Sequence, residues 1–303
     1  MTSRADASAA KGSLWVVAAP LGNPEDLSPR ARSTLATADM VLAEDTRSAR
    51  RLLAEAAVPG PGPAILSCFD GNEQARAEEA VRRVAAGENV ALLSEAGTPL
   101  VSDPGFRVVA AVIAAGLPVR PVPGPSAVLA ALVGSGLPSD RFTFVGFAPR
   151  KSGARRRLFQ QLKDHPMTLV IYEAPQRTGE TLADLADVLG AERPVCLARE
   201  LTKPYEEFVR GTLATLRDRY RDDRPLGEVT LVVGGAPVPS ADNDESLSDD
   251  ALEKRAAALL ESGLSARDAA DALAAQTGQP RRRIYALVTK VAGDRRSEEH
   301  EAG

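Results

Sequence analysis

Three loops rich in glycine, proline and hydroxyl side chains follow apolar segments of the chain and give the first sign of chemistry. They occupy residues 20–23 (PLGN), 94–99 (SEAGTP, continuing as LVSDPG) and 123–127 (PGPSA). A glycine lets a ligand approach the main chain closely because it has no Cβ, and ligands of open α/β sheets bind beyond the carboxyl ends of strands. We therefore expect the three loops to share one pocket. Taken alone, each loop is also compatible with an ordinary turn.

A charged segment, Glu44-Asp45-Thr46-Arg47, follows another apolar stretch. Asp45 and Arg47 could orient a polar substrate there or accept a proton. The same pattern is typical of a helix N-terminus, where acidic residues complement the helix dipole and need no catalytic role. The spacing does not decide between these two interpretations.

Two runs of basic residues open segments with helical patterns. The runs are Arg150, Lys151, Arg155, Arg156 and Arg157, and then Arg281, Arg282 and Arg283. Cations at the start of a helix oppose its dipole, at a cost of roughly a few tenths of a kcal/mol each. A contact with nucleic-acid phosphates is therefore one interpretation of both runs, and a solvated charged face is the other.

Composition argues against several other kinds of site. The chain of 303 residues has two histidines and two cysteines, which disfavours histidine triads, HExxH zinc sites and a disulfide framework. We expect Cys68 and Cys196 to be reduced and partly buried, and we expect no metal. The net charge of −4 means that any nucleic-acid contact is a local patch. An aromatic content of 4% argues against an RNA module built on base stacking.

Length and hydropathy predict the general class of protein. A chain of this length suggests about two domains with a small third. No apolar run approaches the roughly 20 residues that span a bilayer, and the first dozen residues lack the apolar core of a secretory signal. We therefore expect a cytoplasmic protein.

Short β-rich segments alternate with helical patterns from residue 14 to about residue 235, which predicts an α/β fold. The expected strands are residues 14–18, 40–43, 89–94, 118–122, 142–147, 168–172, 194–199, 207–210 and 228–233. Residues 146–157 resemble an interdomain connection and residues 234–247 a linker. The expected helices beyond the linker are residues 248–262, 265–276 and 281–291. The expected division is a disordered tail (1–12), an N-terminal α/β domain (13–148), a second α/β domain (149–235), a linker (236–247), a helical domain (248–292) and a disordered tail (293–303).

Eight segments resemble, in order and spacing, the ribosomal RNA small subunit methyltransferase I family of the tetrapyrrole-methylase superfamily. They are LWVVAAPLGNPEDLSPRA, LAEDTRSARRLL, LLSEAGTPLVSDPG, VPGPSA, GLPSDRFTFVGFAPRK, YEAPQR, LARELTK and GEVTLVV. The resemblance implies two α/β domains of the tetrapyrrole-methylase type with a cofactor cleft between them, and a small C-terminal domain like a helix-turn-helix. It also implies an S-adenosylmethionine-dependent 2′-O-methyltransferase that modifies a cytidine in the decoding region of 16S rRNA. The implied partners are the 30S subunit and a second copy of the chain, without a membrane.

The resemblance also assigns residues to the cofactor. They are Pro20, Leu21, Gly22, Asn23, Glu95, Ala96, Gly97, Thr98, Gly124, Ser126, Ala127, Tyr172, Glu173, Ala198, Glu228 and Thr230. Three positions depart from the family pattern, which usually has Asp at Glu95, often has Lys at Leu226 and in many members has His at Gln176. These departures affect individual contacts rather than the assignment.

Methyl transfer to a ribose hydroxyl requires orientation and desolvation from the protein. A base helps, because a 2′-hydroxyl is a poor nucleophile at neutral pH. No histidine lies near a motif, so the base is a carboxylate, Lys203 or water. Our hypothesis takes Asp45 or Glu200 as proton acceptor, with Arg47 and Lys203 fixing a phosphate or the developing alkoxide. A tetrapyrrole C-methyltransferase of the same fold and a non-catalytic ribosome-associated RNA-binding protein are the alternatives.

Overall fold

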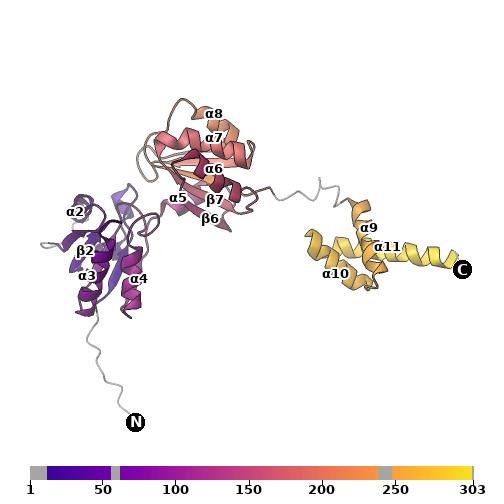
Figure 1. Ribbon diagram of the computed structural model, residues 1–303, viewed down its shortest axis with the longest axis horizontal. Helices are drawn as coiled ribbons and strands as arrows, with labels where there is room; N and C mark the ends of the chain where they lie inside the picture. The colour runs from indigo at the N-terminus through magenta and orange to yellow at the C-terminus, as the bar shows by residue number, and fades with distance from the viewer. Residues whose placement is uncertain (1–11, 56–61, 238–247, 302–303) are drawn as a thin grey trace, which may run out of the picture. The chain divides into compact units, whose positions relative to one another are not determined.

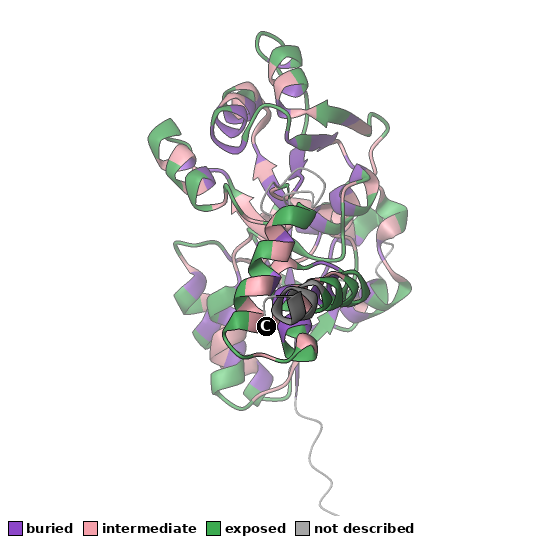
Figure 2. Cartoon of the chain, turned by 90° about the vertical axis from the view of Figure 1, so that its right-hand side faces the viewer, coloured by how far each residue is buried: buried purple, intermediate pink, exposed green. Residues whose placement is uncertain are grey.

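The computed structural model describes residues 12–55, 62–237 and 248–301, with side chains described up to residue 293. The chain forms two compact units, Met1–Ala236 and Pro237–Gly303. In the described residues, the first unit holds two five-stranded sheets covered by helices and the second unit is helical (Figure 1). Buried residues follow the strands and the inner faces of helices, whereas exposed residues follow the outer faces (Figure 2).

The first sheet is parallel, with the strand order β3-β2-β4-β1-β5. Its strands are β1 (Leu14–Val17), β2 (Met40–Ala43), β3 (Ala64–Ser67), β4 (Val90–Leu93) and β5 (Val119–Val122). Strands β2 and β4 are buried along their whole length, because a parallel sheet carries helices on both faces. The expected strands of this half are confirmed with slightly shorter ends, and β3 is an additional strand that the sequence analysis did not predict.

Helices cover the first sheet on both faces. They are α1 (Pro29–Ala36), α2 (Thr46–Glu55), α3 (Glu73–Ala85) and α4 (Phe106–Ala114), with a short 3-10 helix η1 (Pro24–Asp26) before α1. Alternate residues of a strand point to opposite faces, so Val41 packs with α1 and α2 while Leu42 packs with α3 and α4. Helix α1 begins as its sequence predicts: the Ser28 side chain accepts a hydrogen bond from Ala31 N, and Pro29 occupies the first helical position.

The strand order brings three strand ends together. Strand β1 lies between β4 and β5 and is parallel to both. The carboxyl ends of these three neighbours therefore meet at one edge of the sheet, and the loops that follow them are residues 20–23, 94–99 and 123–127. Open α/β sheets bind ligands at such an edge, beyond the carboxyl ends of their strands.

The second sheet has the order β6-β7-β10-β8-β9. Its strands are β6 (Phe142–Phe147), β7 (Thr168–Glu173), β8 (Pro194–Arg199), β9 (Glu207–Thr212) and β10 (Val229–Val233). Strands β6 and β7 pair in parallel, and the other pairs are antiparallel. The helices of this half are α5 (Ala127–Ser135), α6 (Ser152–Gln161), η2 (Pro175–Arg177), α7 (Thr178–Leu189) and α8 (Leu213–Arg219). Helix α5 packs on one face of this sheet, and α6, α7 and α8 pack on the other.

The expected boundary between the α/β halves, at residue 148, does not coincide with the division between the sheets. Strand β6 belongs to the second sheet, and α5 already packs against Val170 and Val232 of that sheet. Helix α5 (AVLAALVGS) has no charged side chain, so it is stabilised by burial. The face of the second sheet provides this burial, which is why α5 belongs with that sheet. Residues 146–157, which we interpreted as an interdomain connection, form the end of β6, a turn and the start of α6.

The second unit contains α9 (Asp249–Glu261), α10 (Ala266–Thr277) and α11 (Arg281–Glu301). Its core includes Leu252, Leu273 and Ile284. The helices agree with those expected, except that α11 continues through the segment expected to be a tail from residue 293. Residues 238–247, most of the expected linker, lie outside the described residues. Across the part of the chain that is described, no helix has both the length and the apolar character needed to cross a membrane.

Candidate active site

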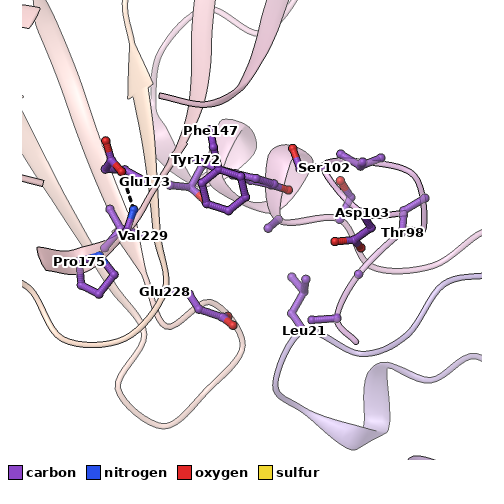
Figure 3. A pocket seen from close by; sticks show the side chains of 17 residues that line it. Leu21, Thr98, Ser102, Asp103, Phe147, Tyr172, Glu173, Pro175, Glu228 and Val229 are labelled. Carbon is purple, nitrogen blue, oxygen red and sulfur yellow. Dashed lines mark hydrogen bonds between the residues drawn. The ribbon is translucent and has the colours of Figure 1, made fainter. Parts of the chain in front are cut away.

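A cavity of about 280 Å³ lies where the strand ends of the first sheet meet β7 and β10 of the second. Ten residues assigned to the cofactor line it: Leu21, Ala96, Gly97, Thr98, Ser126, Ala127, Tyr172, Glu173, Glu228 and Thr230. The loops after β1, β4 and β5 therefore share one pocket, as their composition predicted. Figure 3 shows that side chains from both sheets surround the cavity, with Leu21 and Asp103 on one side and Tyr172 and Glu228 on the other.

Main-chain and hydroxyl hydrogen bonds fix the loops in place. Ala19 and Gly97 exchange backbone hydrogen bonds of 2.8 and 3.1 Å. Ser94 Oγ donates to the Gly97 carbonyl at 2.7 Å, and Thr98 Oγ1 donates to the Pro125 carbonyl at 2.9 Å. Gly97 has a φ of +73°, and a Cβ there would lie 3.0 Å from Leu21 Cδ2. Both the backbone conformation and the nearby Leu21 side chain therefore favour glycine at this point.

Aromatic side chains form the wall that belongs to the second sheet. Tyr172 contacts Phe144 and Phe147 edge to face, with ring centroids 4.9 and 5.4 Å apart. Burial, helped by the charge of Asp103, raises the pKa of Tyr172 to about 12, so its hydroxyl is protonated at neutral pH. Phe147 also lines the pocket, yet 56% of its surface is exposed.

Glu173 lines the pocket, but its carboxylate is engaged in structural contacts. It accepts a hydrogen bond from Ala174 N at 2.7 Å (Figure 3). It also accepts a hydrogen bond from Thr181 Oγ1 and forms an ion pair with Arg177. Because the carboxylate is buried, these donors compensate for the loss of water. Glu173 therefore orders the turn between β7 and α7.

Asp103 lines the pocket but was not among the site residues expected from the sequence. Figure 3 shows its carboxylate at the cavity, beside Ser102. Among the described residues it has no hydrogen-bond or ion-pair partner. Burial, together with the carboxylates of Glu44 and Glu95, raises its pKa from 3.8 to about 6. Its sequence signal was weak, because the stretch LVSDPG suggests a turn and neither burial nor nearby charge can be read from it.

Lys203 and Glu200, two of the proposed catalytic residues, connect the two halves of the unit. Lys203 Nζ donates to Glu200 Oε1 at 3.0 Å and to Glu228 Oε2 at 3.1 Å. The stem of Lys203 crosses Gly22, where a Cβ would lie 2.2 Å from Lys203 Cγ. Asn23 N also donates to Thr202 Oγ1 at 3.1 Å. The loop after β8 is therefore held against the loop after β1.

The protonation states of this pair agree with a structural role. Burial alone would raise the pKa of Glu200, but hydrogen bonds from Lys203 and from the Glu228 backbone lower it. Burial alone would lower the pKa of Lys203, but its bonds to Glu200 and Glu228 raise it. A carboxylate with a lowered pKa is a weak base and an ammonium with a raised pKa keeps its proton. Neither Glu200 nor Lys203 lines the cavity.

Asp45 and Arg47 are not in the cavity either. Asp45 Oδ1 accepts a hydrogen bond of 2.6 Å from Arg47 N at the first turn of α2. This backbone hydrogen bond lowers the pKa of Asp45. The helix N-terminus interpretation of the segment is therefore supported, and the structure gives no support to Asp45 as the base.

Six residues assigned to the cofactor lie outside the main cavity. Pro20, Gly22 and Glu95 line a second hollow of about 140 Å³, where Ser48 Oγ donates to Glu95 Oε1 at 3.0 Å. The other three have roles in folding. Asn23 Oδ1 accepts a hydrogen bond from Glu25 N and caps η1, Gly124 allows close packing on Ala18, and Ala198 is fully buried beneath α5.

Two cations of the first basic run form ion pairs with α7, and one of them, Arg155, is buried. Arg155 is 1% exposed and pairs with Asp184 at 2.7 Å. It lies on the same face of α6 as buried Phe159, one helical turn later, and this face packs on α7. Arg156 pairs with Asp184 and Asp187 at 3.1 and 2.9 Å. The arginines therefore join α6 to α7.

Some of the remaining cations of the two runs have ion-pair partners and others do not. Arg281 pairs with Asp271, and Arg283 pairs with Asp249 at 2.9 Å. Within these two runs, the exposed cations for which the described residues provide no ion-pair partner are Arg150, Lys151, Arg157 and Arg282. Arg150 lines a hollow of about 640 Å³ that borders the main cavity and shares Phe147 and Ala174 with it. Of the two runs, these four positions are therefore available for an anionic partner.

The chain is similar to proteins of one family over most of its length. Residues 13–217 match the family of Tetrapyrrole (Corrin/Porphyrin) Methylases. The chain is 47% identical over 276 residues to the Ribosomal RNA small subunit methyltransferase I of Xylella fastidiosa (strain Temecula1), which covers 90% of this chain and 98% of that protein. It is 42% identical over 283 residues to the Synechocystis protein of the same name, with 93% and 99% covered.

The fold has solved counterparts. The crystal structure of uroporphyrin-III C-methyl transferase from Thermus thermophilus, complexed with S-adenyl homocysteine, matches with a TM-score of 0.53 at 24% identity. The match covers 74% of this chain and 97% of that chain. At this identity the likeness concerns the fold. The family match over residues 13–217 and the near full-length relatives show that the chain belongs to the tetrapyrrole methylase family and, within it, to the ribosomal RNA small subunit methyltransferase I proteins.

Proposed function

We propose that the protein transfers a methyl group from S-adenosylmethionine to the ribose 2′-hydroxyl of a cytidine in the decoding region of 16S rRNA, on the 30S subunit. The observation that carries this proposal is the identity of 42–47% over about nine-tenths of the chain with proteins named for methylation of small-subunit rRNA.

The cavity suits S-adenosylmethionine as donor. The sulfonium and ammonium groups of this molecule are cationic, and the acidic side chain of Glu228 lines the cavity. Its floor is main chain at Gly97, where a side chain would occupy the space beside Leu21. The fold neighbour crystallised with S-adenyl homocysteine supports the same choice. When bound, the donor supplies an activated methyl group, so the protein has to orient the acceptor and accept its proton.

We infer that RNA reaches the donor through the hollow beside Phe147. Arg150 and Gln176 line this hollow, and Arg150, Lys151 and Arg157 are exposed cations. An exposed aromatic ring next to cations is suited to a nucleotide, because the ring stacks on the base while the cations meet phosphates. Arg282 of the C-terminal unit is a further phosphate contact in this proposal, whereas the buried Arg155 is not.

We also infer that the protein acts in the cytoplasm as a homodimer. Helix α5 exposes Leu129 and Val133, with 52% and 76% of their surfaces accessible. Neighbouring exposed apolar side chains are typical of a protein interface, and the family resemblance favours a second copy as the occupant. Light scattering should give twice the mass of the chain, and Val133→Lys should shift the measured mass toward that of the monomer. A monomer at all concentrations would contradict this part.

One labelling experiment tests the function. The protein is incubated with methyl-labelled S-adenosylmethionine and 30S subunits that lack the modification, and the label is then mapped. The proposal predicts label on the ribose of one cytidine in the decoding region. Label on another rRNA atom would contradict the finer assignment, and transfer to a tetrapyrrole alone would support the other activity of this fold. Binding to subunits without transfer would indicate a non-catalytic RNA-binding protein.

A further inference from the structure

One carboxylate that lines the main cavity makes, within the described part of the chain, no hydrogen bond or ion pair that would stabilise the fold. Asp103 is half-buried at the pocket wall and has no hydrogen-bond or ion-pair partner among the described residues. A buried charge without a partner is costly, because it loses water and gains nothing in return. Such a group in a ligand cavity is a candidate for a role in the reaction.

The turn that carries Asp103 is strained and firmly anchored. Leu100 and Ser102 have φ values of +72° and +68°, in the left-handed region that non-glycine residues rarely adopt. The turn ends at Gly105, whose N–H donates to Glu73 Oε1 at 2.9 Å, and this same buried oxygen accepts from Arg107 N at 2.7 Å. Backbone strain of this kind persists where the surrounding structure enforces it, often at functional sites. The strained turn places Asp103 at the cavity.

The other ionisable groups near the cavity are unsuited to accept a proton. Tyr172 remains protonated at neutral pH, and the carboxylate of Glu173 is taken up by its three donors. Glu228 is paired with Lys203 at 3.1 Å. Among the described residues, His165 contacts Thr143 at 2.7 Å and does not line the cavity. Asp103 is left as the available base.

We infer that Asp103 is the general base of the proposed methyl transfer and takes the proton of the acceptor 2′-hydroxyl directly. This inference rests on the proposed function. In the step, the ribose oxygen forms a bond to the methyl carbon while the bond between that carbon and sulfur breaks. The electron pair of the broken bond stays on sulfur, giving neutral S-adenosylhomocysteine. The hydroxyl proton moves to a carboxylate oxygen of Asp103, and the product is the 2′-O-methyl ribose.

The charges around Asp103 agree with this role. The groups that face it are the carboxylates of Glu44 after β2 and Glu95 after β4, and the hydroxyl of Tyr172 on β7. Burial and the carboxylates of Glu44 and Glu95 keep the pKa of Asp103 near 6, so the carboxylate is ionised at pH 7.5 and is a stronger base than an exposed aspartate. The hydroxyl becomes strongly acidic as its oxygen is methylated, so a base of this strength is sufficient in a concerted step.

Asp103→Asn removes the charge while preserving the shape, and Asp70→Asn is a matched control. Asp70 follows β3 at the same end of the sheet and does not line either hollow at the strand ends. With labelled donor and unmethylated 30S subunits, we expect Asp103→Asn to lower kcat by at least ~100-fold. We expect the Kd for S-adenosylmethionine, measured by calorimetry, to change by no more than about threefold. Asp70→Asn should resemble the wild type in both measurements.

The pH dependence gives two further readouts. The kcat/KM of the wild type should rise through pH about 6 and level off, and this rise should be absent from any residual activity of Asp103→Asn. In the folded protein the pKa of Asp103 is raised from 3.8, so its ionisation costs stability as the pH increases from about 4 to about 6. Asp103→Asn should therefore be more stable than the wild type at pH 7, and the difference should shrink toward pH 4.

Each possible result decides the inference. Asp103→Asn with kcat within tenfold of the wild type would overturn it, while leaving the proposed function intact. A large loss of donor affinity with kcat preserved at saturation would also overturn it, and would make Asp103 an anchor for the cationic donor. A wild-type protein that transfers no label to 16S rRNA would overturn the proposed function and this inference together.

Discussion

Adding a single methyl group at Gly97, where main chain forms the floor of the cavity, tests whether this floor contacts the donor. Gly97→Ala introduces a Cβ that lies 3.0 Å from Leu21 Cδ2, at a residue with φ of +73°. The left-handed backbone costs an L-residue about 1–2 kcal/mol, so the free energy of unfolding should fall by that amount. Because Leu21 lines the cavity, its displacement should narrow the donor site as well. We expect the Kd for S-adenosylmethionine to rise by at least ~10-fold, which corresponds to about 1.4 kcal/mol.

A matched variant separates strain from obstruction. Gly116, after α4, has φ of +66°, and a Cβ there would have no neighbour within 4 Å. Gly116→Ala should therefore lose about as much stability as Gly97→Ala while binding the donor like the wild type. Urea unfolding measures the first quantity and calorimetry the second. Equal donor affinities for both variants and the wild type would refute the argument that this floor contacts the donor.

Three other variants test the acceptor side and the core. Phe147→Leu should raise the KM for 30S subunits by about tenfold through loss of stacking and leave the donor affinity unchanged. Phe142→Leu, on the same strand, should change neither the KM nor the donor affinity. Equal changes in KM for the two variants would refute the stacking proposal. Arg157→Ala should weaken binding to 30S subunits and reduce its salt dependence, so an unchanged salt slope would remove Arg157 from the interface. Arg155→Ala should lower the free energy of unfolding by about 3 kcal/mol, because Asp184 loses a buried partner, and a loss below about 0.5 kcal/mol would contradict this. Burial alone would raise the pKa of Asp184, but hydrogen bonds from Arg156 and Arg155 outweigh burial and lower this pKa from 3.8. The stabilisation is thus present above pH about 4 and lost as the pH falls through the lowered pKa, and this acid-side loss should be smaller in Arg155→Ala.

The general plan of the protein could be predicted from local patterns. Alternating apolar segments indicated two series of strands, and the cap at Ser28 and the glycine after α10, Gly278, marked helix ends. The loops at residues 20–23, 94–99 and 123–127 were predicted to converge because parallel strand ends meet at one edge. The strand order β4-β1-β5 satisfies that condition. These features depend on short-range sequence, which is visible in one chain.

Features that depend on tertiary contacts could not be predicted in this way. Strand β3 directly follows Gly62 and Pro63, which suggest a loop, and its pairing with β2 is a tertiary contact. Arg155 looks like its neighbours in the sequence, and only the packing of α6 on α7 shows that it is buried. Asp103 and Asp45 are both acidic residues after apolar segments, but one faces the cavity and the other begins a helix. Burial and partner identity decide such cases.

The central claim is that the strand-end loops of the first sheet and β10 of the second form the seat of the methyl donor. A crystal structure of the protein with S-adenosylhomocysteine tests it most directly. The account predicts the ligand in the cavity that Gly97, Ala127 and Thr230 line, with its sulfur on the side of Asp103. A ligand bound elsewhere on the chain, with this cavity filled only by solvent, would contradict the account.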